Sequence, residues 1–124
     1  MKIFLETSLL SDASLSQLGE ELVQMRVSLN EFCVSALTHF QILWGYSLAK
    51  RSTEKYEEFI KRLGIEVVPL TKIDSEEAAR MKASKKDLLD CLIAATAKRY
   101  GAVLWTKDSD FLKFLPSDGV RIIS

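Results

Sequence analysis

Acidic residues in the C-terminal third of the chain have the types and the spacing that a metal-dependent reaction needs. Asp90 precedes the apolar, small-residue-rich run 91–97, and Asp108 and Asp110 come soon after the apolar run 102–105. This order predicts a helix with an acid in its first turn, followed by a strand with acids at its carboxyl end. Ligand sites of open α/β sheets lie at the carboxyl ends of strands. Carboxylates gathered there favour a hard divalent cation.

Two polar residues in the first half of the chain are placed to join these acids. Glu6 follows the apolar run 3–5, which predicts a strand with an acid at its exit, and Gln41 lies in the apolar helix after a second predicted strand, 32–35. Packed carboxylates repel one another and stay ionised when a cation neutralises them. Mg²⁺ or Mn²⁺ takes oxygen ligands and can activate a bound water for phosphodiester hydrolysis.

Strands and helices alternate along nearly the whole chain. The predicted strands are continuous apolar runs at 3–5, 32–35, 65–68, 102–105 and 120–123. Continuous rather than alternating apolar runs are typical of a parallel sheet that helices cover on both faces. The length of 124 residues favours one domain, 1–124, with a real hydrophobic core.

Helix boundaries are predicted from capping residues and breakers. Ser14 is the expected N-cap of the first long helix. The apolar helix after the second strand is expected to end at Gly45 or shortly after. A short helix is expected to run to Lys82, with Asp74 or Ser75 as its cap.

The bulk composition is that of an ordinary globular protein. Hydrophobic residues make up 48% of the chain and charged residues 27%, and the formal net charge is zero. A large basic footprint for nucleic acid is therefore absent, although local basic patches remain possible. Cys33 and Cys91 lie in apolar contexts, which predicts buried free thiols in a reducing compartment. With no signal-peptide pattern and no apolar run of membrane-spanning length, we expect a cytoplasmic protein.

Four motifs together resemble the PIN-domain proteins of the VapC type, the endoribonuclease toxins of toxin–antitoxin pairs. They are Phe4–Leu10, Val34–Gly45, Asp90–Ala97 and Thr106–Phe111, in the family's order and at similar spacing. The resemblance covers essentially the whole chain and implies a PIN-like three-layer α/β/α fold around a mostly parallel sheet of about five short strands. It also implies RNA hydrolysis with Mg²⁺ or Mn²⁺ and a metal-activated water, a small VapB-like antitoxin partner, and a homodimer.

The resemblance assigns roles residue by residue. It implies catalytic roles for Glu6, Gln41, Asp90 and Asp108, and metal ligation by Glu6, Asp90, Asp108 and Asp110. Thr7 and Thr106 are implied to orient carboxylates or water. Two positions depart from the family pattern, because Glu6 stands where Asp is usual and Gln41 where Glu is usual. Glu6 keeps the charge with a longer reach, whereas Gln41 loses the charge and keeps an oxygen that can ligate a hard cation.

Several residues near these acids have two interpretations. Lys85, Lys86 and Lys107 are either solvated charges or contacts to the phosphates of a bound strand. Asp87 is either a capping-box partner of Ser84 or an additional site charge.

Two groups of side chains on the apolar helix are assigned to the surface. His39 is expected to be a surface or partner-contact residue rather than a catalytic base. Phe40, Trp44 and Tyr46 are candidates for a self-association or antitoxin surface, since aromatic anchors dominate interfaces.

Three function classes follow from these residues. The first is the metal-dependent endoribonuclease. The second is a degenerate PIN-like domain that binds RNA or a partner without turnover, favoured by the neutral Gln41. The third is a small doubly wound domain with a phosphoacceptor Asp, which the lack of an acidic pair after an early strand disfavours.

Overall fold

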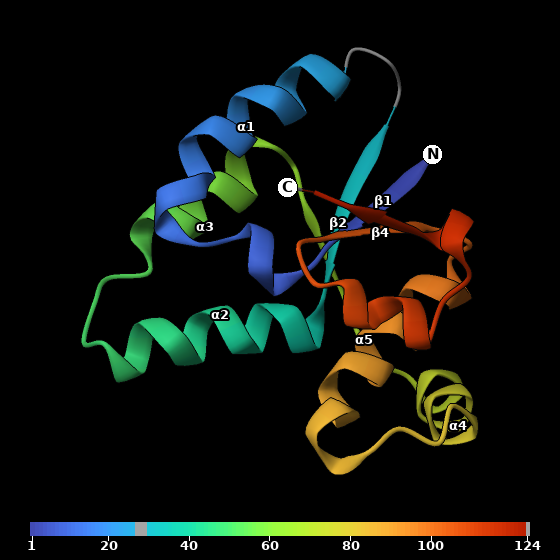
Figure 1. The fold of residues 1–124 in the computed structure, drawn as a ribbon. Helices are drawn as coiled ribbons and strands as arrows, with labels where there is room; N and C mark the ends of the chain where they lie inside the picture. The colour runs from blue at the N-terminus through green and yellow to red at the C-terminus, as the bar shows by residue number, and fades with distance from the viewer. Residues whose placement is uncertain (27–29, 124) are drawn as a thin grey trace.

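Five short strands form one sheet at the centre of the computed structural model, which describes residues 1–26 and 30–123 (Figure 1). The strands are β1 (Lys2–Leu5), β2 (Glu31–Ser35), β3 (Glu66–Val68), β4 (Val103–Thr106) and β5 (Val120–Ile122). Their order is β3-β2-β1-β4-β5, and every neighbouring pair is parallel. The predicted α/β class is confirmed, and the sheet is wholly rather than mostly parallel.

Helices cover both faces of this sheet. The α-helices of the described residues are α1 (Asp12–Arg26), α2 (Ala36–Leu48), α3 (Glu54–Arg62), α4 (Lys72–Arg80) and α5 (Leu88–Arg99). Short 3-10 helices are η1 (Thr7–Leu9), η2 (Lys85–Asp87), η3 (Ser109–Lys113) and η4 (Ser117–Gly119). One hydrophobic core joins α1, α2 and α3 to the sheet, and a second joins α5 to the other face, with α4 packed on α5 (Figure 1). This gives the three layers that the resemblance implied.

Side chains of β1 supply both cores, because successive residues of a strand point to opposite faces. Ile3 and Leu5 enter the first core, and Phe4 enters the second; all three are essentially inaccessible to solvent. Ala94 and Ala97 let α5 approach the sheet closely at Phe4. β1 is therefore the fixed centre from which the site residues extend.

The first two helix boundaries differ from the predicted ones. α1 begins at Asp12, because the backbone carbonyl of Ser11 already accepts the first helical hydrogen bonds, so Ser14 lies inside the first turn. α2 continues through Gly45 to Leu48. Tyr46 packs into the first core and holds the helix beyond the glycine, which tertiary packing can do against a weak local propensity.

The predicted cap of α4 is also wrong. Thr71 is the N-cap, and its Oγ1 accepts a hydrogen bond from the Asp74 backbone N at 3.4 Å. Asp74 Oδ2 in turn accepts one from the Thr71 backbone N at 3.0 Å, which completes a capping box. Asp74 is thus the third residue of the helix rather than its cap.

The carboxyl ends of β1, β2 and β4 meet at one edge of the sheet. From β1 the chain order runs outward to β2 and β3 on one side and to β4 and β5 on the other. Such a reversal is where open α/β sheets form their ligand crevice. Glu6 directly follows β1, Ser35 ends β2 and Thr106 ends β4. No helix among the described residues is long and apolar enough to cross a membrane.

Candidate active site

Glu6 is the innermost acid at this edge, with only 6% of its surface exposed. Its Oε1 accepts hydrogen bonds from Ser8 Oγ at 2.6 Å, from Ser8 N at 3.2 Å and from Thr106 Oγ1 at 2.6 Å. Charge-assisted bonds of this kind fix the orientation of a carboxylate. All three reach the same oxygen, so within the described contacts Oε2 is the oxygen of Glu6 that is left to bind a cation.

Ser8 is a site residue that sequence reasoning missed. Besides donating to Glu6, its Oγ accepts a hydrogen bond from the Lys107 backbone N at 2.9 Å and lies 3.3 Å from Thr106 Oγ1. It therefore ties η1 to the end of β4. A serine two residues after an acid, at a helix start, is a local signal that predicts such side-chain bonding.

Asp90 lies in the first turn of α5 and is surrounded by other acids. Burial raises the pKa of its carboxyl group to about 6, with further contributions from the negative charges of Glu6, Asp108, Asp87 and Asp110. These acids, from β1, α5 and η3, therefore share one region of negative potential. Asp108 caps η3 by accepting a hydrogen bond from the Asp110 backbone N at 2.9 Å.

Asp87 and Asp110 lie at the margin of this region, and both form ion pairs with Lys113. Lys113 Nζ lies 3.5 Å from Asp87 Oδ2 and 3.6 Å from Asp110 Oδ2. Asp87 also accepts a hydrogen bond from Ser84 Oγ at 3.3 Å, while its charge acts on Asp90. The bond joins the two side chains and no side-chain cap bond is made to the backbone, so the capping-box interpretation is wrong. Lys113 is a second residue that the sequence analysis did not single out.

Gln41 contacts Thr7 rather than an acid. Thr7 Oγ1 donates a hydrogen bond to Gln41 Oε1 at 2.5 Å. Ser35 fixes the start of α2 by accepting a bond from the Thr38 backbone N at 3.0 Å, which sets the position of Gln41 along the helix. Gln41 Oε1 keeps a second lone pair beside the bond from Thr7, and the amide group also carries two N–H donors. Thr7, expected to orient carboxylates or water, orients the Gln41 amide through this bond.

The predicted basic residues remain at the surface. Lys85, Lys86 and Lys107 are all exposed, close in sequence to Asp87, Asp90 and Asp108. Thr106 is fully buried and links two parts of the site. Its Oγ1 donates a hydrogen bond to the Glu6 carboxylate and accepts one from the Asp108 backbone N at 3.0 Å.

Two predictions about α2 need correction. His39 is half-buried, and its Nδ1 lies 2.8 Å from the hydroxyl of the buried Tyr56, so it links α2 to α3. Tyr46 is buried in the first core and cannot belong to a docking surface. The exposed aromatic residues are Phe40 and Trp44, each more than half exposed.

The donor chemistry of the site fits a hard divalent cation. Glu6, Asp90 and Asp108 offer carboxylate oxygens whose mutual repulsion an ion would relieve. Among residues 1–26 and 30–123, no three acids, histidines or cysteines already stand at ligating separations. To share an ion, the carboxylates would have to come closer together than they stand here.

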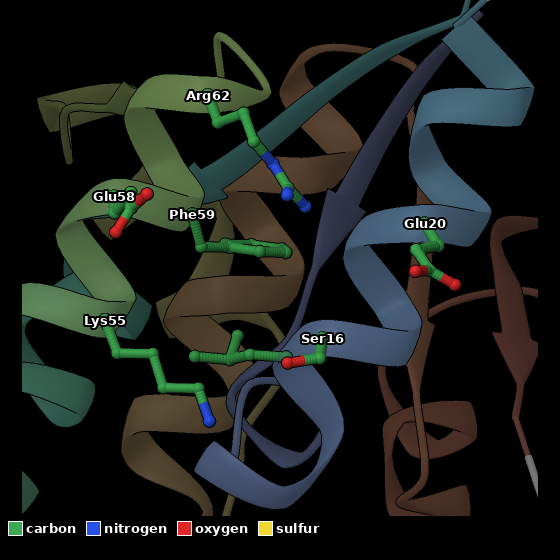
Figure 2. Close-up of a pocket in the computed structure, with 7 residues that line it drawn as sticks. Ser16, Glu20, Lys55, Glu58, Phe59 and Arg62 are labelled. Carbon is green, nitrogen blue, oxygen red and sulfur yellow. The ribbon is translucent and has the colours of Figure 1, made fainter.

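A separate cavity of about 320 Å³ lies between α1 and α3 (Figure 2). Figure 2 shows Arg62 of α3 pointing towards α1, with Phe59 below it. Gly19 allows this approach, because a Cβ at that position would clash with the Arg62 guanidinium. The residues that line the cavity include none of the site carboxylates.

The PIN-domain family model matches residues 3–114, which include every candidate site residue. The chain belongs to the PIN-domain family. No curated protein matches this PIN domain in sequence.

Solved structures share the fold of this PIN domain at low sequence identity. VapBC2 from Rickettsia felis, bound to a DNA fragment from its promoter, has a TM-score of 0.79 at 17% identity, with 98% of each chain covered. VapBC-1 from nontypeable Haemophilus influenzae has a TM-score of 0.69 at 16% identity and the same coverage. FitAB bound to the IR36 DNA fragment has a TM-score of 0.62 at 22% identity, covering 98% of this chain and 93% of the other. At these sequence identities, the similarity shows a shared fold and nothing beyond it.

Proposed function

We propose that this PIN domain is a metal-dependent endoribonuclease of the VapC type, which hydrolyses phosphodiester bonds of RNA. The observation that carries the proposal is the convergence of Glu6, Asp90 and Asp108 at the switch point of the sheet. Ionised oxygens at such a crevice suit Mg²⁺ or Mn²⁺.

Each site residue has a role that follows from its contacts. Glu6, Asp90 and Asp108 would hold the metal, which when bound polarises the phosphate and lowers the pKa of a water. Ser8 and Thr106 donate hydrogen bonds to Glu6 Oε1, which would leave Oε2 to bind the ion.

The remaining polar residues act around that centre. Gln41, oriented by Thr7, offers N–H donors to a phosphate oxygen. Asp110 would add a ligand only by leaving Lys113. Lys107, with Lys85 and Lys86, supplies positive charge for the flanking phosphates.

A second candidate function is a PIN-like domain that binds RNA or a partner without turnover. The observation that favours it is the neutral Gln41, whose oxygen already accepts a hydrogen bond from Thr7. In that case the acids at the switch point would be fewer than the chemistry needs.

Cleavage of a mixed-sequence RNA with single-stranded and structured parts tests the two candidates. We expect cleavage with Mn²⁺ or Mg²⁺ that disappears in EDTA and in the Asp90→Asn variant. Cleavage that survives Asp90→Asn would point to a contaminant or to another site. An inactive protein whose melting temperature does not respond to metal would favour the binding module.

We also propose a small VapB-like antitoxin as partner and a homodimer as the free state. The structural neighbours are toxin–antitoxin complexes, and α2 exposes Phe40, Trp44 and Leu48 at helical spacing. Large exposed apolar side chains on one stripe mark protein interfaces. Light scattering should give a mass of twice 14.0 kDa for the isolated chain. Trp44→Ser should weaken antitoxin binding with no loss of RNA cleavage.

A further inference from the structure

A groove of about 310 Å³ runs from the candidate active site along α2. Its lining includes Thr7, the residue after Glu6, and Gln41, which is hydrogen-bonded to Thr7. Arg51, beyond the end of α2, also lines it. Its volume is at the lower end of the roughly 300–1,000 Å³ range of sites that bind small organic ligands. That size suits one nucleoside rather than a helix of a partner protein.

The groove has both polar and apolar lining residues. Thr7 and Gln41 supply a hydroxyl and an amide group at the end near Glu6, and the lining also includes Ser11 and the apolar Leu10, Ile42 and Gly45. The far end holds the Arg51 guanidinium, centred 5.8 Å from the Tyr46 ring. The flat guanidinium of Arg51 is a surface on which an unpaired RNA base can stack, and its positive charge complements a phosphate.

Gly45 keeps the middle of the groove open. A Cβ at this position would meet no atom within 4 Å outside the local helix backbone. Glycine destabilises the interior of a helix, so helix stability does not explain why Gly45 lies inside α2. A Cβ therefore fits at this position, and a side chain built on it would occupy the groove that Gly45 lines.

We infer that this groove binds a base of the single-stranded RNA next to the phosphate held at Gln41, with Arg51 contacting the following part of the strand. The inference rests on the proposed function and names the part of the substrate that this face of α2 recognises. Phe40, Trp44 and Leu48 lie on an adjacent side of α2, outside the groove lining. The RNA surface and the proposed antitoxin stripe are therefore distinct.

The test compares Gly45→Leu with Ser47→Leu, which adds the same side chain at an exposed position of α2 outside the groove. Binding of a short fluorescein-labelled single-stranded RNA is measured by anisotropy in EDTA, where no cleavage occurs. We expect Gly45→Leu to bind about 5- to 100-fold more weakly, the range for loss of one stacked base. Ser47→Leu should bind as the wild type does. Gly45→Leu should melt at the same or a higher temperature, which excludes unfolding as the cause.

The outcomes separate this inference from the proposed function. Equal RNA affinity of the two variants, with cleavage by the wild type intact, overturns the groove as an RNA site and leaves the nuclease standing. Unchanged RNA affinity of Gly45→Leu with a lowered mass in light scattering assigns the groove to a protein contact and also overturns the inference. A wild type that neither cleaves nor binds RNA overturns both.

Discussion

Asp90 is the site residue whose charge the fold disfavours most clearly. Burial and the neighbouring acids raise its pKa to about 6, compared with an ordinary value near 4. A carboxyl group with a raised pKa stabilises the fold while it is protonated, and this stability is lost as the pH rises from about 4 to 6. Asp90→Asn should therefore stabilise the metal-free protein at pH 7 by about 1–2 kcal/mol. Urea unfolding in EDTA measures this, and the gain should vanish at pH 4; lower stability of the variant at pH 7 would contradict it.

Replacing the amide nitrogen of Gln41 by an oxygen, as in Gln41→Glu, would add one negative charge to the site. Gln41→Glu adds a carboxylate near Glu6, with Thr7 still able to donate a hydrogen bond to it. A further negative charge near a bound divalent ion should tighten Mn²⁺ binding by about tenfold, measured by calorimetry. Thr7→Val is the matched control, since it frees the amide without adding charge. An affinity that does not respond to Gln41→Glu would mean that Gln41 does not face the ion.

Single residues differ in how far the sequence could predict their place. Glu6 and Asp108 follow apolar runs, and a parallel sheet brings strand ends to one edge, so their approach follows from local patterns. The bond from Ser8 to Glu6 has a local signal, but the contacts of Ser8 with β4 and the place of Lys113 do not follow from any such pattern. Ser8 meets Thr106 and Lys107 across nearly the whole chain, and Lys113 meets Asp87 only once η3 packs beside α5.

At the scale of elements, α4 is fixed to α5 by one buried acid. Asp74 is fully buried, and Arg99 Nε donates to its Oδ1 at 2.6 Å. Burial alone would raise the pKa of Asp74, but the hydrogen bonds from Arg99 and the Thr71 backbone and the charge of Arg99 outweigh it and lower the pKa. α4 thus depends on a contact with α5 that its own sequence does not contain.

Asp74→Ala should lower the free energy of unfolding by about 2–4 kcal/mol, because it removes a capping box and leaves Arg99 unpaired. A lowered pKa contributes stability above pH 4 that is lost as the pH falls through the folded-state value. The difference between wild type and variant should therefore shrink in acid. Glu76→Ala, at an exposed position of the same helix, is the control. Equal losses from both substitutions would contradict the role of Asp74.

The elements themselves were more predictable than their ends. Apolar runs located all five strands, since strands buried on both faces leave no other pattern. Helix ends depend on contacts that a window of sequence does not hold. Gly45 predicts a helix end, yet Tyr46 anchors the next turn in the core. Asp74 was expected to cap α4, but it is the third residue of the helix and serves both the capping box with Thr71 and the ion pair with Arg99.

At the scale of the whole molecule, metal binding and folding are linked. The candidate ligands come from the ends of β1 and β4 and from α5, and they meet only in the folded chain. An ion that binds only the native state stabilises it, by about 2.7 kcal/mol at one hundred times its Kd. Mn²⁺ should therefore raise the melting temperature in calorimetry, and EDTA should reverse the shift. Asp108→Asn should respond less, and an equal shift in that variant would show that the ion binds elsewhere.

The hydrogen bond between Thr106 and Glu6 spans 100 residues of sequence, and this separation sets the order of events during synthesis. Synthesis reaches Thr106 only after Glu6, β2, β3 and α5 have been made. Until β4 pairs with β1, Glu6 lacks its hydrogen bond from Thr106, and Asp108 is not yet placed near it. Under the proposed function, a partly made chain would lack a complete metal site and could not cleave RNA, and that site would form only once β4 has been made.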